Sequence, residues 1–410
     1  MPASAPALAQ NSFHRGVVPR AARTAIPIGL AVSSLLVYLI VLASSGHQDL
    51  DAYLTAGRDL LAGRPLYDAF LHHPFPDPTL RPAYIYPPIF AVLIAPLTWL
   101  PRVVAGWTWL LAMQAALALS ITVVVRSLNP PWAAGWVALV LTFTFFPLLV
   151  DVAQGQTNLL VLALLMLGVV GILRGQSQAG AWLGVAAAIK ITPLLLLGWL
   201  LFQRRWRAAG FLALGFAGTT GLGLLVRPSD TVTFFGQVLP GLARGTAYYS
   251  NQSLTGVLGR LLTTNPYTNP WVALPWESAL AVGAALALLS WWAFNTRRLD
   301  PTAAAFSFLP LLPLLSSVTW EHHLVVLLPL IWLTVLRLAG RGWPVPATAL
   351  LAAEVVCLSV LSRWHPGPGF GSPTFRAAQT GDPLTILTAN ALFGGTLILF
   401  LGSQWLLRSR

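Results

Sequence analysis

Apolar runs separated by short polar segments recur along the chain from Ala25 almost to the C-terminus. Helices of about 15 to 24 apolar residues are long enough to cross about 30 Å of hydrocarbon. The pattern predicts about twelve such runs, near residues 25–45, 86–100, 103–125, 132–150, 158–173, 179–202, 208–226, 272–294, 302–318, 323–338, 344–361 and 384–406. We therefore expect an all-α, polytopic membrane protein with about 10 to 12 transmembrane helices.

Composition supports a membrane protein. Hydrophobic residues make up 56% of the 410 residues and charged residues 9%, and the mean hydropathy is +0.71. Soluble domains carry about 25% charged residues, so a soluble fold is excluded. The single cysteine, Cys357, allows neither an intramolecular disulfide nor a cysteine metal cluster. No phosphate-binding glycine motif of a nucleotide site is present.

The net charge of +12 at first suggests a nucleic-acid partner. However, the arginines gather in short clusters at the ends of apolar runs, as in 204–207, 297–298, 337–341 and 408–410, which is the pattern of cytoplasmic loops. We expect no nucleic-acid partner. Instead, the pattern predicts a multi-pass protein of the cytoplasmic membrane with a cytoplasmic tail (1–24), one transmembrane domain (25–407) and a cytoplasmic end (408–410). The first apolar run is too long for a signal peptide and is expected to stay uncleaved.

This orientation makes the first loop, residues 46–85, extracytoplasmic. The segment QGQTN, residues 154–158, then has two possible locations. Strict alternation of crossings places it in the cytoplasm. If the run 86–100 (preceded by the interfacial aromatic segment Tyr84–Phe90) and the run 179–202 (interrupted by Lys190 and Pro193) are re-entrant, it lies outside. We favour the second topology.

The first loop carries the strongest candidate for chemistry. It holds five of the twelve acidic residues of the chain, and Asp49 and Asp51 directly follow the first apolar run. If the helix continues, Asp49 and Tyr53 share a face at i and i+4. A partly desolvated carboxylate at the membrane surface has a raised pKa and is suited to act as a general base. The plainer alternative is that these acids cap a surface helix.

Lys190 is the only lysine of the chain, in the apolar segment GAWLGVAAAIKITPLLLL. An ionisable group in a membrane segment costs at least about 2.5 to 3.5 kcal/mol and suggests a functional site. An ammonium group beside a helix break is suited to hold a phosphate group at head-group depth. The alternative is a lysine that extends to the interface to be solvated.

Two further polar segments are candidates for substrate binding. Gln154, Gln156 and Asn158 begin a helix, and their amides suit a hydroxyl-rich ligand. His322 and His323 lie between two apolar runs in the segment WEHH. Adjacent histidines of a helix diverge by about 100°, which favours bonding to a sugar or phosphate over joint metal binding. In both segments the alternative is a polar cap at the interface.

The chain resembles a known enzyme family in five blocks that occur in the same order. These blocks are DLDAYLTAGRDLLAGRPLYD, YPPIFAVLIAPL, QGQTNLLVLALL, AAAIKITPLLLL and SVTWEHHLVVLLP, within about residues 47–330. They are similar to the polyprenyl-phosphate-mannose-dependent mannosyltransferases of glycosyltransferase family 87, a branch of the GT-C superfamily of membrane glycosyltransferases.

The resemblance implies a GT-C-type fold and inverting transfer of a sugar, with mannose expected, from a polyprenyl phosphate to a lipid or glycan hydroxyl outside the cytoplasm. It maps the catalytic base onto Asp49 with Tyr53, the histidine block onto His322 and His323, and the phosphate-holding lysine onto Lys190. Asp51 departs from the family pattern and competes with Asp49 for the role of base. No metal or other cofactor is implied.

Two alternatives remain open. Many helices with a buried lysine and interfacial acids also describe a transporter or flippase of lipid-linked glycans, although such proteins commonly contain internal repeats and none is evident here. A polymerase or ligase of surface polysaccharide shares the chemistry but has another acceptor. The sequence specifies neither the acceptor nor the oligomeric state.

Overall fold

The computed structural model describes residues 20–73, 83–128, 131–361 and 383–408, and this part of the chain is helical without named strands. The elements are, in order, α1 (Arg20–Ser44), α2 (Gln48–Leu61), α3 (Asp68–His72), α4 (Pro88–Ile94), η1 (Ala95–Trp99), α5 (Arg102–Leu128), α6 (Trp132–Thr144), α7 (Phe146–Gln154), α8 (Asn158–Leu173), η2 (Ser177–Ala179), α9 (Gly180–Ile189), η3 (Thr192–Leu195), α10 (Leu196–Phe202), α11 (Trp206–Val226), α12 (Pro228–Thr233), η4 (Phe234–Val238), α13 (Leu239–Ala243), α14 (Leu254–Leu262), α15 (Glu277–Thr296), α16 (Pro301–Phe306), α17 (Leu311–Leu315), η5 (Glu321–Leu327), α18 (Leu328–Gly340), α19 (Val345–Val355), η6 (Val356–Val360), α21 (Pro383–Ala389) and α22 (Ala391–Leu406).

Each predicted apolar run corresponds to a helix or to consecutive short helices, so the all-α prediction is confirmed for the described residues. By length and composition, four described helices are able to cross a membrane, or seven if each of three sharply bent pairs forms one crossing. Several runs contain prolines, such as Pro147 and Pro193, which remove a backbone donor and shorten the helices. The expected 10 to 12 crossings stay a prediction, as do the tails 1–24 and 408–410, which lie mostly outside the described residues.

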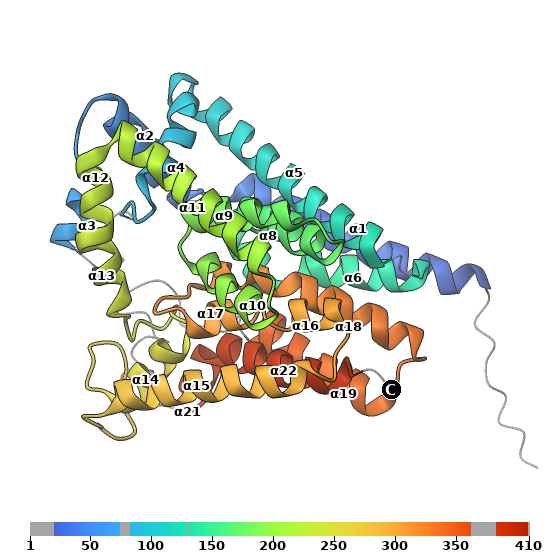
Figure 1. Cartoon of the computed structure of the whole chain (residues 1–410). Coiled ribbons are helices and arrows are strands. Elements are labelled where there is room, and N and C mark those ends of the chain that lie inside the picture. Colours follow the sequence, from blue (N-terminus) through green and yellow to red (C-terminus); the bar gives the residue numbers. More distant parts are fainter. Residues whose placement is uncertain (1–19, 74–82, 129–130, 362–382, 409–410) are drawn as a thin grey trace, which may run out of the picture.

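Arginine-bearing helix ends meet at one end of the bundle, which we call the arginine end. Arg337 pairs with Asp300 at 2.8 Å, Arg341 donates to the carbonyl of Leu406, and Arg408 donates to Asn295 at 3.0 Å. In Figure 1 the start of α1 and the C-terminal end lie toward this end, and α2, α3, α12 and α14 lie toward the other. The shared location of these arginines agrees with the positive-inside pattern.

The segment from Tyr86 to Arg102 leaves and rejoins the opposite end of the bundle, which we call the site end. Both of its limits contact α2: the hydroxyls of Tyr53 and Tyr86 lie within hydrogen-bonding distance at 2.9 Å, and Arg102 pairs with Asp51 at 2.5 Å. The helices between them, α4 and η1, together span only Pro88–Trp99. This geometry is that of a re-entrant element.

The segment α9–η3–α10 is a second element that turns back on itself, and it enters from the direction of the arginine end. A Cβ at Gly180, where α9 begins, would collide with the carbonyl of Ala208 near the start of α11. Beyond α10, Arg205 donates to the carbonyl of Ile172 at the end of α8, at 2.8 Å. Both ends of the segment therefore lie at one level. Its turning point is Lys190, whose extended backbone ends α9.

Candidate active site

Two polar segments far apart in sequence meet at the site end. Much of the expected first loop is helical, and α2 begins with Asp49 and Asp51 in its first turn. The preceding residue, His47, donates its backbone N–H to the carbonyl of Ala153 at the end of α7. Gly155 ends α7 with a left-handed backbone (φ 71°), which glycine adopts without steric cost. This turn brings QGQTN beside the start of α2.

Gln156 connects the base candidate with two tyrosines. Its Nε2 donates to Asp49 Oδ2 at 2.5 Å. Its Oε1 accepts from Tyr53 at 2.8 Å and from Tyr86 at 3.0 Å. Because a carboxylate only accepts, the nitrogen arm of Gln156 points to Asp49, and the oxygen arm is left for the two tyrosines. QGQTN therefore lies on the side of the first loop, and the strictly alternating topology is wrong.

The environment of Asp49 favours a base. Four of the 14 residues of α2 are charged, a composition that favours the membrane surface over its apolar interior. Partial burial raises the pKa of the Asp49 carboxyl from its ordinary 3.8 to about 6, while the Gln156 hydrogen bond and the Lys190 charge limit the rise. Oδ1 of Asp49 carries no hydrogen bond within the described chain, so it is available to a ligand.

A second chain of polar contacts leads to Lys190. Its Nζ donates to Asn158 Oδ1 at 2.5 Å, and Asn158 Nδ2 donates to Asp151 Oδ1 at 2.7 Å. The ammonium also lies 5.7 Å from the centre of the Tyr86 ring. Both Asp49 and Asp151 are close enough to interact electrostatically with Lys190. Base candidate and cation therefore share one site.

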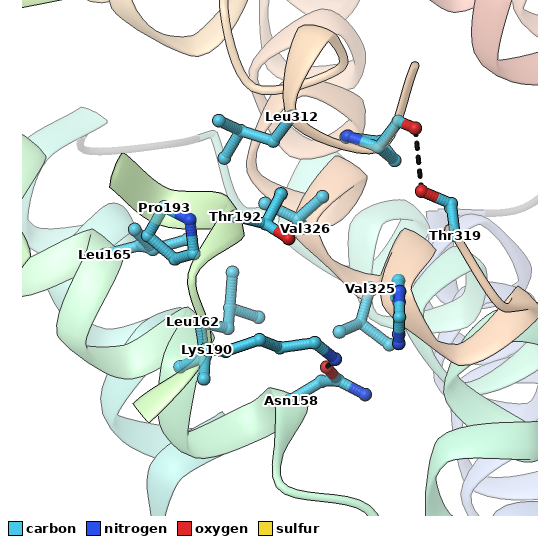
Figure 2. Close-up of a pocket in the computed structure, with 13 residues that line it drawn as sticks. Asn158, Leu162, Leu165, Lys190, Thr192, Pro193, Leu312, Thr319, Val325 and Val326 are labelled. Atoms are coloured by element: carbon cyan, nitrogen blue, oxygen red, sulfur yellow. Dashed lines mark hydrogen bonds between the residues drawn. The ribbon is translucent and has the colours of Figure 1, made fainter. Parts of the chain in front are cut away.

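A small cavity of about 40 Å³ adjoins the lysine. Figure 2 shows Lys190 reaching Asn158 along its edge, with Pro193 on one side and Val325 on the other. Its walls combine a few polar groups with apolar side chains, as is usual for ligand sites. It is too small for a prenyl chain.

The two histidines complete what we call the polar cluster. His323 lines the cavity, and its Nδ1 accepts from the backbone of Trp320 at 3.3 Å. His322 is buried, and neither of its ring nitrogens has a hydrogen-bond partner among the described residues. The two rings meet edge to face on the 3₁₀ helix η5, with centroids 4.7 Å apart.

The structure gathers most predicted site residues into this cluster: Asp49, Tyr53, Gln156, Asn158, Lys190, His322 and His323. Asp51 faces Arg102 instead, with its side chain 48% exposed. Gln154 makes no hydrogen bond to the cluster within the described residues, and its Oε1 is buried there without a partner. Asp49, not Asp51, therefore faces Lys190 and QGQTN.

Sequence reasoning missed two members of the cluster. Asp151 is 1% exposed, and its Oδ2 is unpaired within the described residues. An acid at the end of a long apolar run, three residues before QGQTN, was a usable signal. Tyr86, expected to anchor the protein at the interface, is instead buried against Tyr53, with the rings 5.2 Å apart and nearly perpendicular. Its hydroxyl finds partners only in the folded chain.

The arrangement is that of a polytopic membrane protein with a carboxylate and an ammonium group in one polar cluster at one end of its helical bundle. No group of three or more His, Cys, Asp or Glu side chains suited to a metal occurs in the parts of the chain described. The cluster has the acid–base and charge-stabilising groups that group transfer from an anionic leaving group requires.

The sequence of the chain is similar to that of one family of known proteins. The profile of glycosyltransferase family 87 matches residues 84–317. A polyprenol-phosphate-mannose-dependent alpha-(1-2)-phosphatidylinositol mannoside mannosyltransferase of Mycolicibacterium smegmatis is 30% identical over 78% of this chain and 75% of its own. Its Mycobacterium tuberculosis counterpart is 28% identical over 78% and 76%. The crystal structure of ArnT from Cupriavidus metallidurans bound to undecaprenyl phosphate is similar at a TM-score of 0.40 and 16% identity, over 92% of this chain and 77% of that chain.

The chain belongs to glycosyltransferase family 87. It is a membrane glycosyltransferase, and this membership decides against the transporter alternative. The matched span includes Gln156, Asn158 and Lys190, whereas Asp49 and the two histidines lie outside it. Their assignment therefore depends on the geometry of the polar cluster.

Proposed function

We propose that this glycosyltransferase moves a mannosyl residue from a polyprenyl phosphate to a hydroxyl group of a lipid or glycan, with inversion at C1. The observation that carries the proposal is the meeting of the Asp49 carboxylate and the Lys190 ammonium in one polar cluster, joined through Gln156 and Asn158. The names of the relatives, which state dependence on polyprenol-phosphate-mannose, support the donor.

In this mechanism Asp49 accepts the proton of the acceptor hydroxyl as the acceptor oxygen forms its bond to C1. The bond between C1 and the phosphate oxygen breaks on the opposite face, through an oxocarbenium-like state. The electron pair leaves with the polyprenyl phosphate. Lys190 stabilises the charge that develops there, while the proton remains on Asp49 until it is released to solvent.

The remaining polar residues have supporting roles in the proposal. Gln156, oriented by Tyr53 and Tyr86, is a positioning residue for Asp49. His322 and His323 supply ring nitrogens beside the cavity for a sugar hydroxyl or a phosphate oxygen. Asp51 and Gln154, which the sequence suggested as substrate contacts, have no assigned role because neither faces the cluster.

The proposal also includes the location of the protein and of its polar cluster. The protein lies in the cytoplasmic membrane with both termini in the cytoplasm and the polar cluster on the extracytoplasmic face. In support, the polar cluster lies at the end of the bundle opposite the arginines that bind Asp300, Leu406 and Asn295. Cytoplasmic loops carry the excess of arginine.

The test compares transfer by purified wild-type protein, Asp49→Asn and Asp59→Asn, with polyprenyl-phosphate-mannose as donor and a membrane lipid extract as acceptor. Asp59 is a matched control, because it lies on the same helix but pairs with Arg64, away from the cluster. We expect Asp49→Asn to lose about 10²- to 10⁴-fold in rate and Asp59→Asn to keep wild-type activity.

Equal activity of all three proteins would remove the base assignment, and absence of transfer by the wild type would reject the donor. The proposal gives the charge stabilisation to Lys190 and not to a divalent cation. Addition of EDTA is therefore expected to leave transfer unchanged, and a metal-dependent recovery would contradict this part of the proposal.

A further inference from the structure

Asp151 is a buried acid with no part in the mechanism above. It is 1% exposed and lies on α7, whereas the reacting groups are Asp49 on α2 and Lys190 at the end of α9. A buried carboxylate is costly unless it is hydrogen-bonded or paired. Its retention in an apolar helix therefore requires an explanation.

The contacts of Asp151 supply one. Its Oδ1 accepts from Asn158 Nδ2 at 2.7 Å, and this is the only hydrogen bond of its side chain within the described chain. Asn158 Oδ1 accepts from Lys190 at 2.5 Å. The carboxylate therefore reaches the lysine through one amide and not through a direct hydrogen bond.

The amide of Asn158 has two possible orientations that differ by a half turn. With its oxygen toward Lys190 it accepts a hydrogen bond; after the half turn it would present N–H groups to an ammonium, which only donates. A carboxylate only accepts, so it bonds the nitrogen arm and leaves the oxygen for the lysine. Asp151 thus determines the orientation of Asn158.

This orientation matters because the lysine side chain has several rotatable bonds. Lys190 has three N–H donors, and one is used by Asn158. With that donor held, the other two remain for a ligand in the neighbouring cavity, which Lys190 lines together with Asn158, Thr192 and His323 (Figure 2). A fixed donor pair binds an anion better than a mobile one, because less side-chain entropy is lost on binding.

We propose that Asp151 is a positioning residue that acts through Asn158 to aim Lys190 at the phosphate of the lipid-linked donor. The proposal rests on the function proposed above and adds a residue to it. A rival explanation is that Asp151 serves only as a countercharge for Lys190. The two explanations differ in the effect expected of Asp151→Asn, which keeps a hydrogen-bond acceptor but removes the charge. The positioning role predicts that this variant still binds the phosphate, and the countercharge role predicts that it does not.

The experiment measures the Kd of a polyprenyl monophosphate, which lacks the sugar, for detergent-purified full-length variants. Asp151→Leu removes the acceptor, and we expect its Kd to rise about 10- to 100-fold, the worth of a hydrogen bond to a charged group. Asp151→Asn keeps an acceptor for Asn158, and its Kd is expected to stay within about fivefold of wild type, since the loss is smaller than that bond.

A double variant reverses the polarity of the pair. In Asp151→Asn with Asn158→Asp, the new amide donates to the new carboxylate, which still accepts from Lys190. We expect Asn158→Asp alone to weaken binding, because two adjacent carboxylates lack the amide donor between them. The double variant is expected to return to within about threefold of wild type, the scatter of unperturbed sites.

Glu354→Gln is the control for loss of a buried acid. Glu354 is also 1% exposed, and its carboxylate has no partner in the described structure. It lies on α19, away from the polar cluster, and Glu354→Gln is expected to keep the wild-type Kd. Thermal unfolding of each variant separates weak binding from misfolding, and rescue by the double variant keeps the test valid where Asp151→Leu fails to fold.

The outcomes separate the two proposals. The positioning role is overturned if Asp151→Asn binds the polyprenyl phosphate as weakly as Asp151→Leu does, or if the double variant does not recover binding. The proposed transfer stands in either case. Wild-type binding of the polyprenyl phosphate with the expected variant pattern, but without mannose transfer, rejects the proposed sugar donor and keeps the positioning role. A wild type that does not bind the polyprenyl phosphate overturns both.

Discussion

Lys190 and Arg260 are two cations toward the site end of the bundle, and their hydrogen-bond donors are used differently. Arg260 is 1% exposed, and its donors go to the side chain of Asn390 and to the carbonyls of Tyr248 and Asn251, at 2.7 to 3.1 Å. Lys190 is partly exposed beside a cavity and has one protein acceptor, Asn158. The difference separates a cation that joins loops from one with donors free for a ligand.

The two cations also differ in how much their removal is expected to reduce the stability of the fold. A buried cation is tolerated when its donors are satisfied, and its loss then leaves several buried acceptors unpaired. A cation with spare donors contributes less to folding, and its remaining capacity serves an anion. Substitution of Arg260 should therefore affect stability, and substitution of Lys190 should affect catalysis.

The largest effect is expected from Lys190→Met, which keeps the length of the side chain and removes its charge. We expect transfer to fall about 10²- to 10³-fold, as on removal of a group that stabilises transition-state charge, with little change in the unfolding temperature. Steady-state kinetics and thermal unfolding of the purified protein measure the two quantities. A variant that unfolds early but is fully active while folded would reverse the comparison.

Arg260→Met is expected to show the reciprocal pattern. The carbonyl of Asn251 and the amide oxygen of Asn390 lose their donor, at about 1 to 3 kcal/mol for each buried group left unpaired, whereas the carbonyl of Tyr248 keeps the backbone N–H of Asn251. The unfolding temperature should fall markedly, while the molecules that remain folded keep a rate within about threefold of wild type. A stable protein without activity would make Arg260 a functional cation.

The pH dependence tests Asp49 within the same cluster. A base works only when it is deprotonated, and partial burial raises the pKa of Asp49 to about 6. Below that pH, kcat/KM is expected to fall about tenfold per unit, and above it to level off on the acid side of the profile. A profile whose acid limb lies near pH 4, the ordinary range of an aspartate, would contradict Asp49 as the base.

The smallest effect is expected from Asp51→Asn. Asp51 pairs with Arg102 at 2.5 Å, and the two side chains are 48% and 38% exposed. Exposed pairs contribute about 0 to 1 kcal/mol, so transfer and stability should stay within about fivefold and about 1 kcal/mol of wild type. A loss comparable with that of Asp49→Asn would place both acids in the mechanism.

The sequence predicted a large part of this molecule. Long apolar runs identify membrane helices because a bilayer requires about 20 apolar residues for each crossing. The lone Lys190 and the amides of QGQTN stood out because ionisable and polar groups in apolar surroundings are costly unless they have partners. The helix break at Lys190 and the two turn-backs follow from prolines and short run lengths, and the structure agrees with both.

Only the tertiary structure decided which groups meet. Asp49 and Asp51 differ by about 200° around a helix, so one faces the bundle and the other does not, but neither periodicity nor composition says which. Tyr86 and Asp151 acquired their roles through partners such as Gln156 and Asn158, set by the packing of α2, α7 and α9. The sequence by itself determined that this protein lies in a membrane and which charged residues are candidates for its site. The pairing of those charges depends on amide orientations and helix faces that exist only once distant helices have packed.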